Sequence, residues 1–451
     1  MTVSILLILL FILLIVSGLL IFNKPEYRWK VLLFGSILFY VVIAKWASIA
    51  VFLFSLIVFF GGKIVERTKQ KVLYYGVIAL GLSILLIDKF SLSLSSGIPP
   101  AFAIIGISYI TFNGLSYLFD VRKGYLKPET NYGLLLLYLL YFPYVTAGPL
   151  HRYKKTVAQF REKVGLSNEN FSLGFRLILW GVFKNLVLAQ YVMRLVIIII
   201  DFPDIYKGVY VLLGGFFFFI YLYCDFSSYI DIIRGTSQIF GIKLSQNFRN
   251  RVYASTSRKH FWEGWHITLN HWFRDYVFYR LTAKARKRWQ IDLAMLFTFL
   301  LIGIWHEVSW KFLIWGFMNG IWIITENKLR KYFQFGSEAV RRVLGTIYHI
   351  SIASCIAIIF RSNDVKASIK ALFSHSVIPA SNYMIVLKQI IYISPFFILM
   401  DYFYRKAGER PIEDYFGTLS LRTRWAIYIL LSICILVFGI SKGNDAYYMQ
   451  F

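Results

Sequence analysis

The chain has 451 residues, of which 58% are hydrophobic and 16% charged, and its formal net charge is +26. Together with a mean hydropathy of +0.60, this excludes an ordinary water-soluble protein and predicts a polytopic membrane protein. Because the basic residues sit in short loops between apolar runs, we attribute the charge to the positive-inside rule and anionic lipid headgroups, and expect no nucleic-acid partner.

Apolar runs long enough to cross a bilayer, roughly 17–25 residues each, recur along the chain. The first lacks a positive flank and a small-residue cleavage site, so we expect a retained helix rather than a signal peptide. We predict about eleven crossings. The runs lie near residues 2–22, 31–60 (a pair), 72–88, 100–119, 131–150, 171–200, 208–230, 290–305, 310–325, 341–360, 382–402 and 424–440.

The run from Leu134 to Leu150 disturbs the alternation of loop charge, because it leads directly into basic residues 151–155. It contains the helix breakers Phe142-Pro143 and Ala147-Gly148-Pro149, which are tolerated at membrane depth where protein or water surrounds the backbone. We predict a re-entrant hairpin that returns to the cytoplasmic side. Residues 243–289 are then cytoplasmic, and both termini are extracytoplasmic.

Three isolated cysteines, Cys224, Cys355 and Cys434, lie in apolar sequence without paired spacing, so we expect neither a disulfide nor a zinc site. Cys224 stands next to Asp225 and could line a site there. No repeat or long linker divides the chain. The sequence therefore predicts a single integral membrane domain over residues 1–451.

Residues with chemical potential gather between Tyr221 and Gly320. Asp225 and Tyr229 end an apolar run, where Asp225 either orients a base or only caps or pairs with a nearby arginine. Residues 243–288 carry eleven Lys and Arg against two acids. Read as a helix, Trp262 and His266 share one face there, as in an interfacial amphipathic helix.

Two of the seven histidines stand out, His266 and His306, because apolar and aromatic sequence flanks them. An ionisable group at membrane depth is costly, which makes it a functional candidate. A neutral imidazole there suits a general base acting on a hydroxyl. We expect loop or interface positions for three others, His151, His260 and His271. We expect His349 to be a satisfied buried donor and His375 to lie in an outer loop.

A metal site is not expected, because no third ligand occurs at a recognisable spacing from His266 and His306, and neither HxxxH nor HExxH is present.

Over about residues 100–325 the chain resembles the membrane-bound O-acyltransferases, in the bacterial branch of alginate O-acetyltransferase and teichoic-acid D-alanyltransferase membrane subunits. The terminal Tyr-Met-Gln-Phe also resembles the acetyltransferase branch. By this resemblance His306 is the signature histidine and His266 the second active-site histidine. The matching strings, in family order, are Phe142-Pro143 with Ala147-Gly148-Pro149, Asp225-Phe-Ser-Ser-Tyr229, Phe240-Gly241-Ile242, Asn247-Phe248, Phe261-Trp262 with Trp265-His266, Trp272-Phe-Arg274-Asp275-Tyr276, Gly303-Ile-Trp305-His306 and Trp315-Gly316.

The sequence departs from the family pattern at three places. Glu307 replaces the Gly that usually follows the signature histidine, which adds a carboxylate near the site. Asn319-Gly320 replaces a common His-Gly. After Tyr279, residues 280–288 replace the Pro-Leu-Gly-Gly turn of the acetyltransferase branch, with a length closer to the D-alanyl branch.

The resemblance implies an all-α polytopic fold with re-entrant and interfacial helices in a ring around a funnel. His306 would lie near its floor, and the basic residues 243–288 would lie at its cytoplasmic mouth. The donor would be acetyl-CoA or an acyl carrier protein thioester, with no permanently bound cofactor. Further candidates for donor or substrate binding are Asp225, Tyr229, Asn247, Trp265, Arg274, Asp275, Trp305 and Glu307.

The resemblance further implies acyl transfer, most simply acetyl transfer, from the cytoplasmic side of a bacterial cytoplasmic membrane. The acceptor is a hydroxyl of a cell-surface polysaccharide or of an extracytoplasmic esterase-like partner protein. D-alanyl transfer to teichoic acid is the alternative within the family. A transporter or flippase is the alternative outside it, but the inverted repeats common in transporters are not visible in the sequence.

Overall fold

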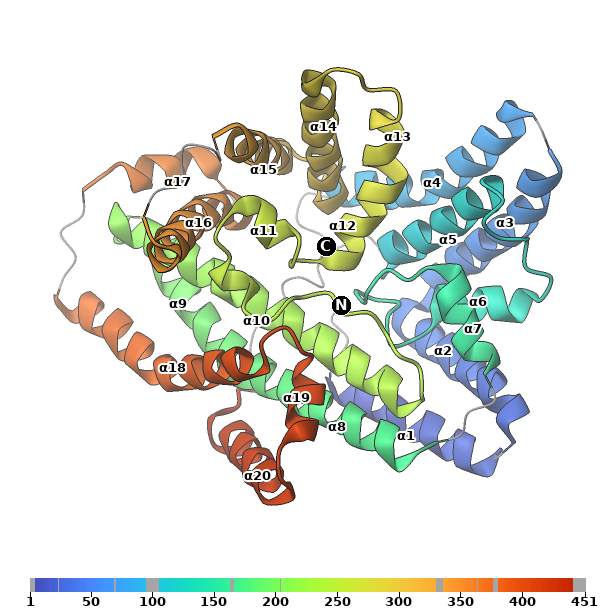
Figure 1. The fold of residues 1–451 in the computed structure, drawn as a ribbon, viewed down its shortest axis with the longest axis horizontal. Helices are drawn as coiled ribbons and strands as arrows, with labels where there is room; N and C mark the ends of the chain where they lie inside the picture. The colour runs from blue at the N-terminus through green and yellow to red at the C-terminus, as the bar shows by residue number, and fades with distance from the viewer. Residues whose placement is uncertain are drawn as a thin grey trace. The chain divides into compact units, whose positions relative to one another are not determined.

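The computed structural model describes residues 5–22, 24–68, 70–94, 105–162, 166–202, 204–329, 336–362, 364–375 and 380–440. Within these ranges the regular structure is helical (Figure 1), apart from one antiparallel bridge between Phe248 and Trp265. The predicted all-α class is confirmed. The terminal Tyr-Met-Gln-Phe lies outside the described residues.

The helices pack into two compact units. The first comprises residues 1–178, 233–246 and 271–276, and the second comprises residues 179–232, 247–270 and 277–451. Two long helices, α8 (Asn168–Phe183) and α10 (Val209–Ile239), contribute residues to both units. The single integral domain expected over residues 1–451 stays a prediction.

In the first unit, α3 packs against α4 and α5, while α2 packs against α1 and α6. Its helices, besides parts of α8 and α10, are α1 (Ile5–Ile21), α2 (Arg28–Ala44), α3 (Ser48–Arg67), α4 (Lys71–Leu94), α5 (Ile107–Arg122), α6 (Tyr132–Leu140) and α7 (Tyr153–Arg161).

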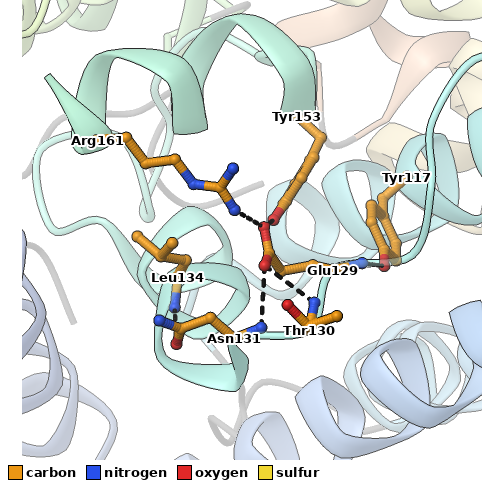
Figure 2. Close-up of polar contacts among 7 residues, drawn as sticks. All are labelled: Tyr117, Glu129, Thr130, Asn131, Leu134, Tyr153 and Arg161. Carbon is orange, nitrogen blue, oxygen red and sulfur yellow. Dashed lines mark hydrogen bonds and ion pairs between the residues drawn. The ribbon is translucent and has the colours of Figure 1, made fainter.

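A buried carboxylate, Glu129, ties α5, α6 and α7 together (Figure 2). One of its oxygens accepts hydrogen bonds from the next two backbone N–H groups, both at 2.9 Å. The other accepts from the Tyr153 hydroxyl at 2.6 Å and from the Arg161 guanidinium. The Glu129 backbone N–H donates to the Tyr117 hydroxyl at 2.8 Å. Burial opposes ionisation, but these donors outweigh it and hold the pKa of Glu129 below its usual value.

The helix break expected in the run 134–150 is confirmed, because α6 ends at Leu140 and turns follow from Phe142 to Ala147. Nine residues of α-helix rise only about 14 Å, about half the hydrocarbon thickness of a bilayer. The segment from Leu134 to Leu150 is buried throughout. Its re-entrant path in a membrane stays a prediction.

The second unit contains a buried ion pair, in which Lys184 lies 2.8 Å from Asp231 of α10. Beyond its shares of α8 and α10, its helices include π-helix η3 (Lys184–Ala189), α9 (Gln190–Ile200), α11 (Arg258–Trp262), α13 (Tyr279–Thr282), α14 (Arg288–His306), α15 (Trp310–Leu329), α16 (Glu338–Arg361), α17 (Val365–Leu372), α18 (Ala380–Ala407), α19 (Ile412–Thr418) and α20 (Leu421–Phe438). Helix α12 (Ile267–Phe273) begins in this unit and ends in the first.

Eight helical segments among the described residues are long and apolar enough to cross a membrane. The expected number of crossings was about eleven. One segment, Arg28–Arg67, contains both α2 and α3, and a shorter apolar helix occupies Leu7–Ile21. The predicted runs near 100–119, 131–150 and 310–325 contain helices α5, α6 and α15, which are not among the eight. The orientation of the termini stays a prediction. The eight segments are Arg28–Arg67, Lys71–Phe90, Asn168–Ile200, Val209–Ile239, Arg288–His306, Glu338–Arg361, Asn382–Ala407 and Leu421–Phe438.

Candidate active site

His306 is the last residue of α14, just before the short connection to α15. The two helices approach most closely at two glycines. A Cβ atom on Gly303 would lie 2.2 Å from the carbonyl oxygen of Phe312, and one on Gly316 would lie 2.4 Å from that of Phe299. Because no side chain fits at such distances, the glycines allow the hairpin to close and thereby position His306.

Aromatic rings surround His306, whose exposed fraction is 5%. Its imidazole stacks on Phe312 with centroids 5.7 Å apart, and meets Trp315 and Phe360 edge-on at 5.3 and 5.4 Å. Trp305 lies at 4.6 Å. Such a shell excludes water, which strengthens any hydrogen bond that the imidazole makes with an entering group.

His266 lies in a tight turn after α11, with a φ of +45° that is unfavourable for a residue other than glycine. Asn247 holds this turn in place. Its side-chain oxygen accepts hydrogen bonds from the backbone N–H and the hydroxyl of Thr268, at 3.0 and 2.8 Å. Its backbone oxygen accepts from the N–H of Ile267 at 3.0 Å. The strained conformation is therefore fixed by its surroundings, as is common at functional sites.

Asn247 also orients the imidazole of His266, because its side-chain amide donates to Nδ1 at 3.2 Å. The amide NH₂ only donates, so Nδ1 accepts and Nε2 carries the ring proton. His266 is buried, and burial lowers the pKa of its imidazole to about 3. The ring is thus neutral at physiological pH and has Nε2–H as its donor.

The interpretation of residues 258–266 as one helix is wrong. Helix α11 ends at Trp262, so Trp262 and His266 do not share a helix face. The reason is tertiary: the backbone bridge between Phe248 and Trp265 and a bond from the Arg249 N–H to the Gly264 carbonyl, 2.9 Å, draw this segment out of the helix.

Both histidines nevertheless line the same small cavity of the second unit, about 50 Å³ in volume. Its walls come from α10, α11, α14, α15 and α16, and from residues 265–269. Apart from His266, His306 and Arg258, the side chains that line it are aromatic or aliphatic. Because sites for drug-sized ligands typically measure roughly 300–1,000 Å³, this cavity fits only a small chemical group.

Arg258 begins α11 at the wall of this cavity and is buried. Its Nη2 donates to the side-chain oxygen of Asn319 at 2.6 Å, which also accepts from the indole N–H of Trp262 at 3.2 Å. The Asn319 amide in turn donates to the Trp315 carbonyl at 2.8 Å. Although burial lowers the pKa of Arg258 to about 10, the guanidinium stays charged at neutral pH.

A second cavity of about 1190 Å³ lies in the same unit. Residues 256–263, the end of α15 and the start of α16 line it, so it adjoins the segments that line the small cavity. Along α16, residues up to Tyr348 face the large cavity and residues from Ala353 onward face the small one. Its lining includes five ionisable side chains that carry or can carry charge at neutral pH: Lys259, His260, Glu263, Glu326 and Arg341.

The other predicted site residues fall into three groups. Trp265 lines the small cavity, and Trp305 lies between the two imidazoles, 4.6 Å from that of His306 and 6.3 Å from that of His266. Asp225, Tyr229 and Glu307 line neither of the two cavities described above.

Asp225 and Tyr229 are buried within α10, and Glu307 forms the carboxyl-terminal cap of α14. Arg274 and Asp275 belong to the first unit, where Asp275 pairs with Arg152 at 2.6 Å.

Sequence reasoning missed two residues of this region. His349 was expected to be a satisfied buried donor, and that is wrong: it is fully buried, and neither ring nitrogen has a hydrogen-bond partner within the described ranges. Instead it packs on the Phe261 ring at 5.1 Å. Arg258 was interpreted only as one of many basic residues at a cytoplasmic mouth. Nothing in the local sequence distinguishes it from its neighbour Lys259, which is exposed.

No group of three or more His, Cys, Asp or Glu side chains could hold a metal ion in the part of the chain that the structure describes. The expectation that the protein needs no metal stays a prediction. The three cysteines are not joined in disulfides.

Long apolar helices and two buried histidines that line one small cavity define an integral membrane protein with a candidate site for chemistry. The chain belongs to the membrane-bound O-acyltransferase (MBOAT) family, whose model matches residues 40–362. The matched region includes both histidines and the whole α14–α15 hairpin.

Three relatives show the range of the family. The chain is 32% identical over 226 residues to the probable alginate O-acetylase AlgI of Azotobacter vinelandii, covering 50% of this chain and 45% of the relative. It is 30% identical over 242 residues to the teichoic acid D-alanyltransferase of Bacillus subtilis, covering 51% and 60%. It is 26% identical over 297 residues to the peptidoglycan O-acetyltransferase of Helicobacter pylori, covering 59% and 56%. The chain thus spans about half the length of these curated relatives.

Proposed function

We propose that this protein transfers an acetyl group from a cytoplasmic thioester, acetyl-CoA, to a hydroxyl group on the outer side of a bacterial cytoplasmic membrane. The observation that carries this proposal is that His266 and His306 line one small buried cavity. The O-acetyl chemistry in the names of the Azotobacter and Helicobacter relatives supports it.

In the proposed reaction, the hydroxyl oxygen attacks the thioester carbonyl carbon while an imidazole nitrogen of His306 accepts the hydroxyl proton. The Nε2–H of His266 donates to the carbonyl oxygen as negative charge develops there. When the tetrahedral intermediate collapses, the C–S bond breaks and the thiolate leaves. The proton on His306 passes to the thiolate, so both histidines end neutral.

In this proposal the two cavities bind different parts of the donor. The large cavity accommodates its bulky anionic part, for which Lys259 and Arg341 provide positive charge. The small cavity accommodates the acetyl group. Tyr348 and Ala353, which line the large and the small cavity respectively, are separated along α16 by roughly 7–8 Å. A thin thiol-bearing arm can span that distance.

The acceptor is a cell-surface polysaccharide, or an extracytoplasmic esterase-like partner protein that passes the acetyl group to it. In this arrangement both termini are extracytoplasmic, and the basic residues 243–288 face the cytoplasm and its anionic lipids. Transfer of D-alanyl from a carrier protein is the competing reaction, favoured by the similarity to the Bacillus relative.

The test compares membranes that contain the wild-type chain with membranes that contain His306→Ala or the control His375→Ala, which alters an exposed histidine. Each receives acetyl-CoA or a D-alanyl carrier-protein thioester with labelled acyl groups, together with envelope polysaccharide from the host.

Ester-linked acetyl label on the polymer, present with wild type and His375→Ala and absent with His306→Ala, is the expected result. If only the D-alanyl donor labels the polymer, the donor is the D-alanyl carrier-protein thioester and not acetyl-CoA. Passage of an intact solute without acyl transfer in any sample identifies a transporter and refutes the proposal.

A further inference from the structure

The small cavity contains a charge that its two histidines do not account for. Arg258 is 3% exposed, and the hydrogen bond of its guanidinium goes to the neutral amide of Asn319. The Nε–H group of Arg258 has no hydrogen-bond partner among the described residues. Burying a cation is costly unless a counter-charge or a function compensates for it.

The acidic residue that faces Arg258 approaches from the other cavity. Glu326 accepts hydrogen bonds from the backbone N–H of Arg258, at 2.9 and 3.0 Å, and lines the large cavity. The described lining of the small cavity includes no carboxylate. A group inside the small cavity therefore meets Arg258 and apolar rings, while Glu326, which partly compensates the charge of Arg258, lies outside the lining of that cavity.

We propose that Arg258 selects the acyl group by charge: the cavity accepts small neutral acyl groups and excludes those that carry an ammonium on the carbon next to the carbonyl carbon, such as aminoacyl groups. This inference rests on the proposed acyl transfer and assigns its substrate class. Asn319 and Trp262 are positioning residues: the Asn319 side-chain oxygen accepts from the Arg258 guanidinium, and the Trp262 indole N–H donates to the same oxygen and fixes it.

The physical basis is repulsion between two cations in a dry site. An ammonium that enters loses its hydration and gains no carboxylate partner, whereas a methyl group of the same size gains apolar contacts. At an effective dielectric constant near 20 and a separation of several ångströms, the repulsion corresponds to discrimination on the order of ten- to a hundredfold. Because the pKa of Arg258 remains near 10, the repulsion persists across neutral pH.

The test uses two donors that differ only in charge, propionyl-CoA and glycyl-CoA, in which a terminal methyl group is exchanged for an ammonium. The ratio of their kcat/KM values is measured for the full-length protein in membranes, with acetyl-CoA as the reference. The variants are Arg258→Met, which removes the charge, and Arg258→Lys, which keeps it. Lys259→Met is the control, because Lys259 lines only the large cavity.

We expect the wild type to favour the propionyl over the glycyl donor by at least about tenfold. Arg258→Met should reduce that ratio at least about fivefold, while Arg258→Lys and Lys259→Met keep it within about twofold. Equal use of both donors by the wild type overturns the inference even if Arg258→Met does not fold. An unchanged ratio in a folded Arg258→Met overturns it as well. A wild type that transfers none of the three acyl groups refutes the proposed function itself.

Discussion

Two buried charges in this molecule have opposite surroundings. In the first unit, the carboxylate of Glu129 accepts hydrogen bonds from two backbone N–H groups and the Tyr153 hydroxyl, and pairs with Arg161 (Figure 2). In the second unit, the guanidinium of Arg258 bonds to the neutral amide of Asn319, and Arg258 lines a small cavity whose other walls are mostly apolar.

The different surroundings of Glu129 and Arg258 indicate a structural role for the first and a functional role for the second. A buried charge whose hydrogen-bonding capacity is filled ties elements together and leaves little to offer a ligand. A buried charge whose surroundings compensate it only partly, beside two histidines, is a candidate for acting on a ligand, as we propose for Arg258. Substitutions at Glu129 should therefore change stability, and substitutions around the small cavity should change chemistry.

The largest expected effect is at the cavity. His306→Ala should lower kcat for acetyl transfer by roughly 10²–10⁴-fold, because the hydroxyl loses its proton acceptor. The melting temperature should change much less than kcat. Measuring both in detergent-solubilised protein, beside His375→Ala, checks this. If His306→Ala retains full activity, His306 is not the proton acceptor, and the contrast between a structural Glu129 and a functional cavity fails.

A glycine substitution should have the next largest effect, and on stability. Gly303→Ala places a Cβ 2.2 Å from the Phe312 carbonyl oxygen, so α14 and α15 must separate at a cost of about 3 kcal/mol or more. Gly76→Ala is the matched control, because its Cβ meets nothing within 4 Å on α4. We expect the control to be neutral or stabilising by about 0.5–1 kcal/mol. Equal melting temperatures for both variants contradict the close packing.

Glu129→Gln should destabilise the protein at neutral pH by about 1–3 kcal/mol, since it weakens several hydrogen bonds and the ion pair. The pKa of Glu129 is lowered in the folded state, so its contribution is complete above the ordinary carboxyl pKa of about 4.3 and disappears as the pH falls through the folded value.

The difference in melting temperature between wild type and Glu129→Gln should consequently shrink in acid, and the ratio of propionyl to glycyl transfer should not move at neutral pH. A difference that stays constant from neutral to acid pH means that the charge of Glu129 is not what stabilises the fold.

The smallest expected effect is a shift in pH dependence. Asn247→Asp keeps the acceptor for Thr268 but replaces the amide donor to His266 Nδ1 with a carboxylate. A carboxylate there favours the imidazolium and raises the pKa of His266 from its low value. The neutral ring then donates Nδ1–H to the new carboxylate and loses its Nε2–H donor, whereas the imidazolium keeps both N–H groups. Activity should therefore fall by about tenfold or less at high pH and recover as the pH falls through the raised pKa of His266. An unshifted profile argues that His266 is not the titrating donor.

Sequence patterns predicted the features that depend on residues close together in the chain. The apolar runs and the breakers after Leu140 predicted helices and a helix end that the structure confirms. The flanks of His266 and His306 selected the two histidines that share a cavity. Helix periodicity failed at residues 258–266, because backbone bonds to Phe248 and Arg249, distant from the local pattern, interrupt the helix.

By itself, the sequence determined the all-α membrane class and the family resemblance, and it selected the two candidate histidines, because hydropathy and motif spacing are encoded along the chain. Only the tertiary structure decided that Asn247 sets the tautomer of His266, and that Arg258, unlike its neighbour Lys259, is buried at the cavity. Burial and hydrogen-bond partners depend on segments such as α15 and α16, which are distant in the sequence. Their packing therefore decides which charged side chains are buried at the small cavity.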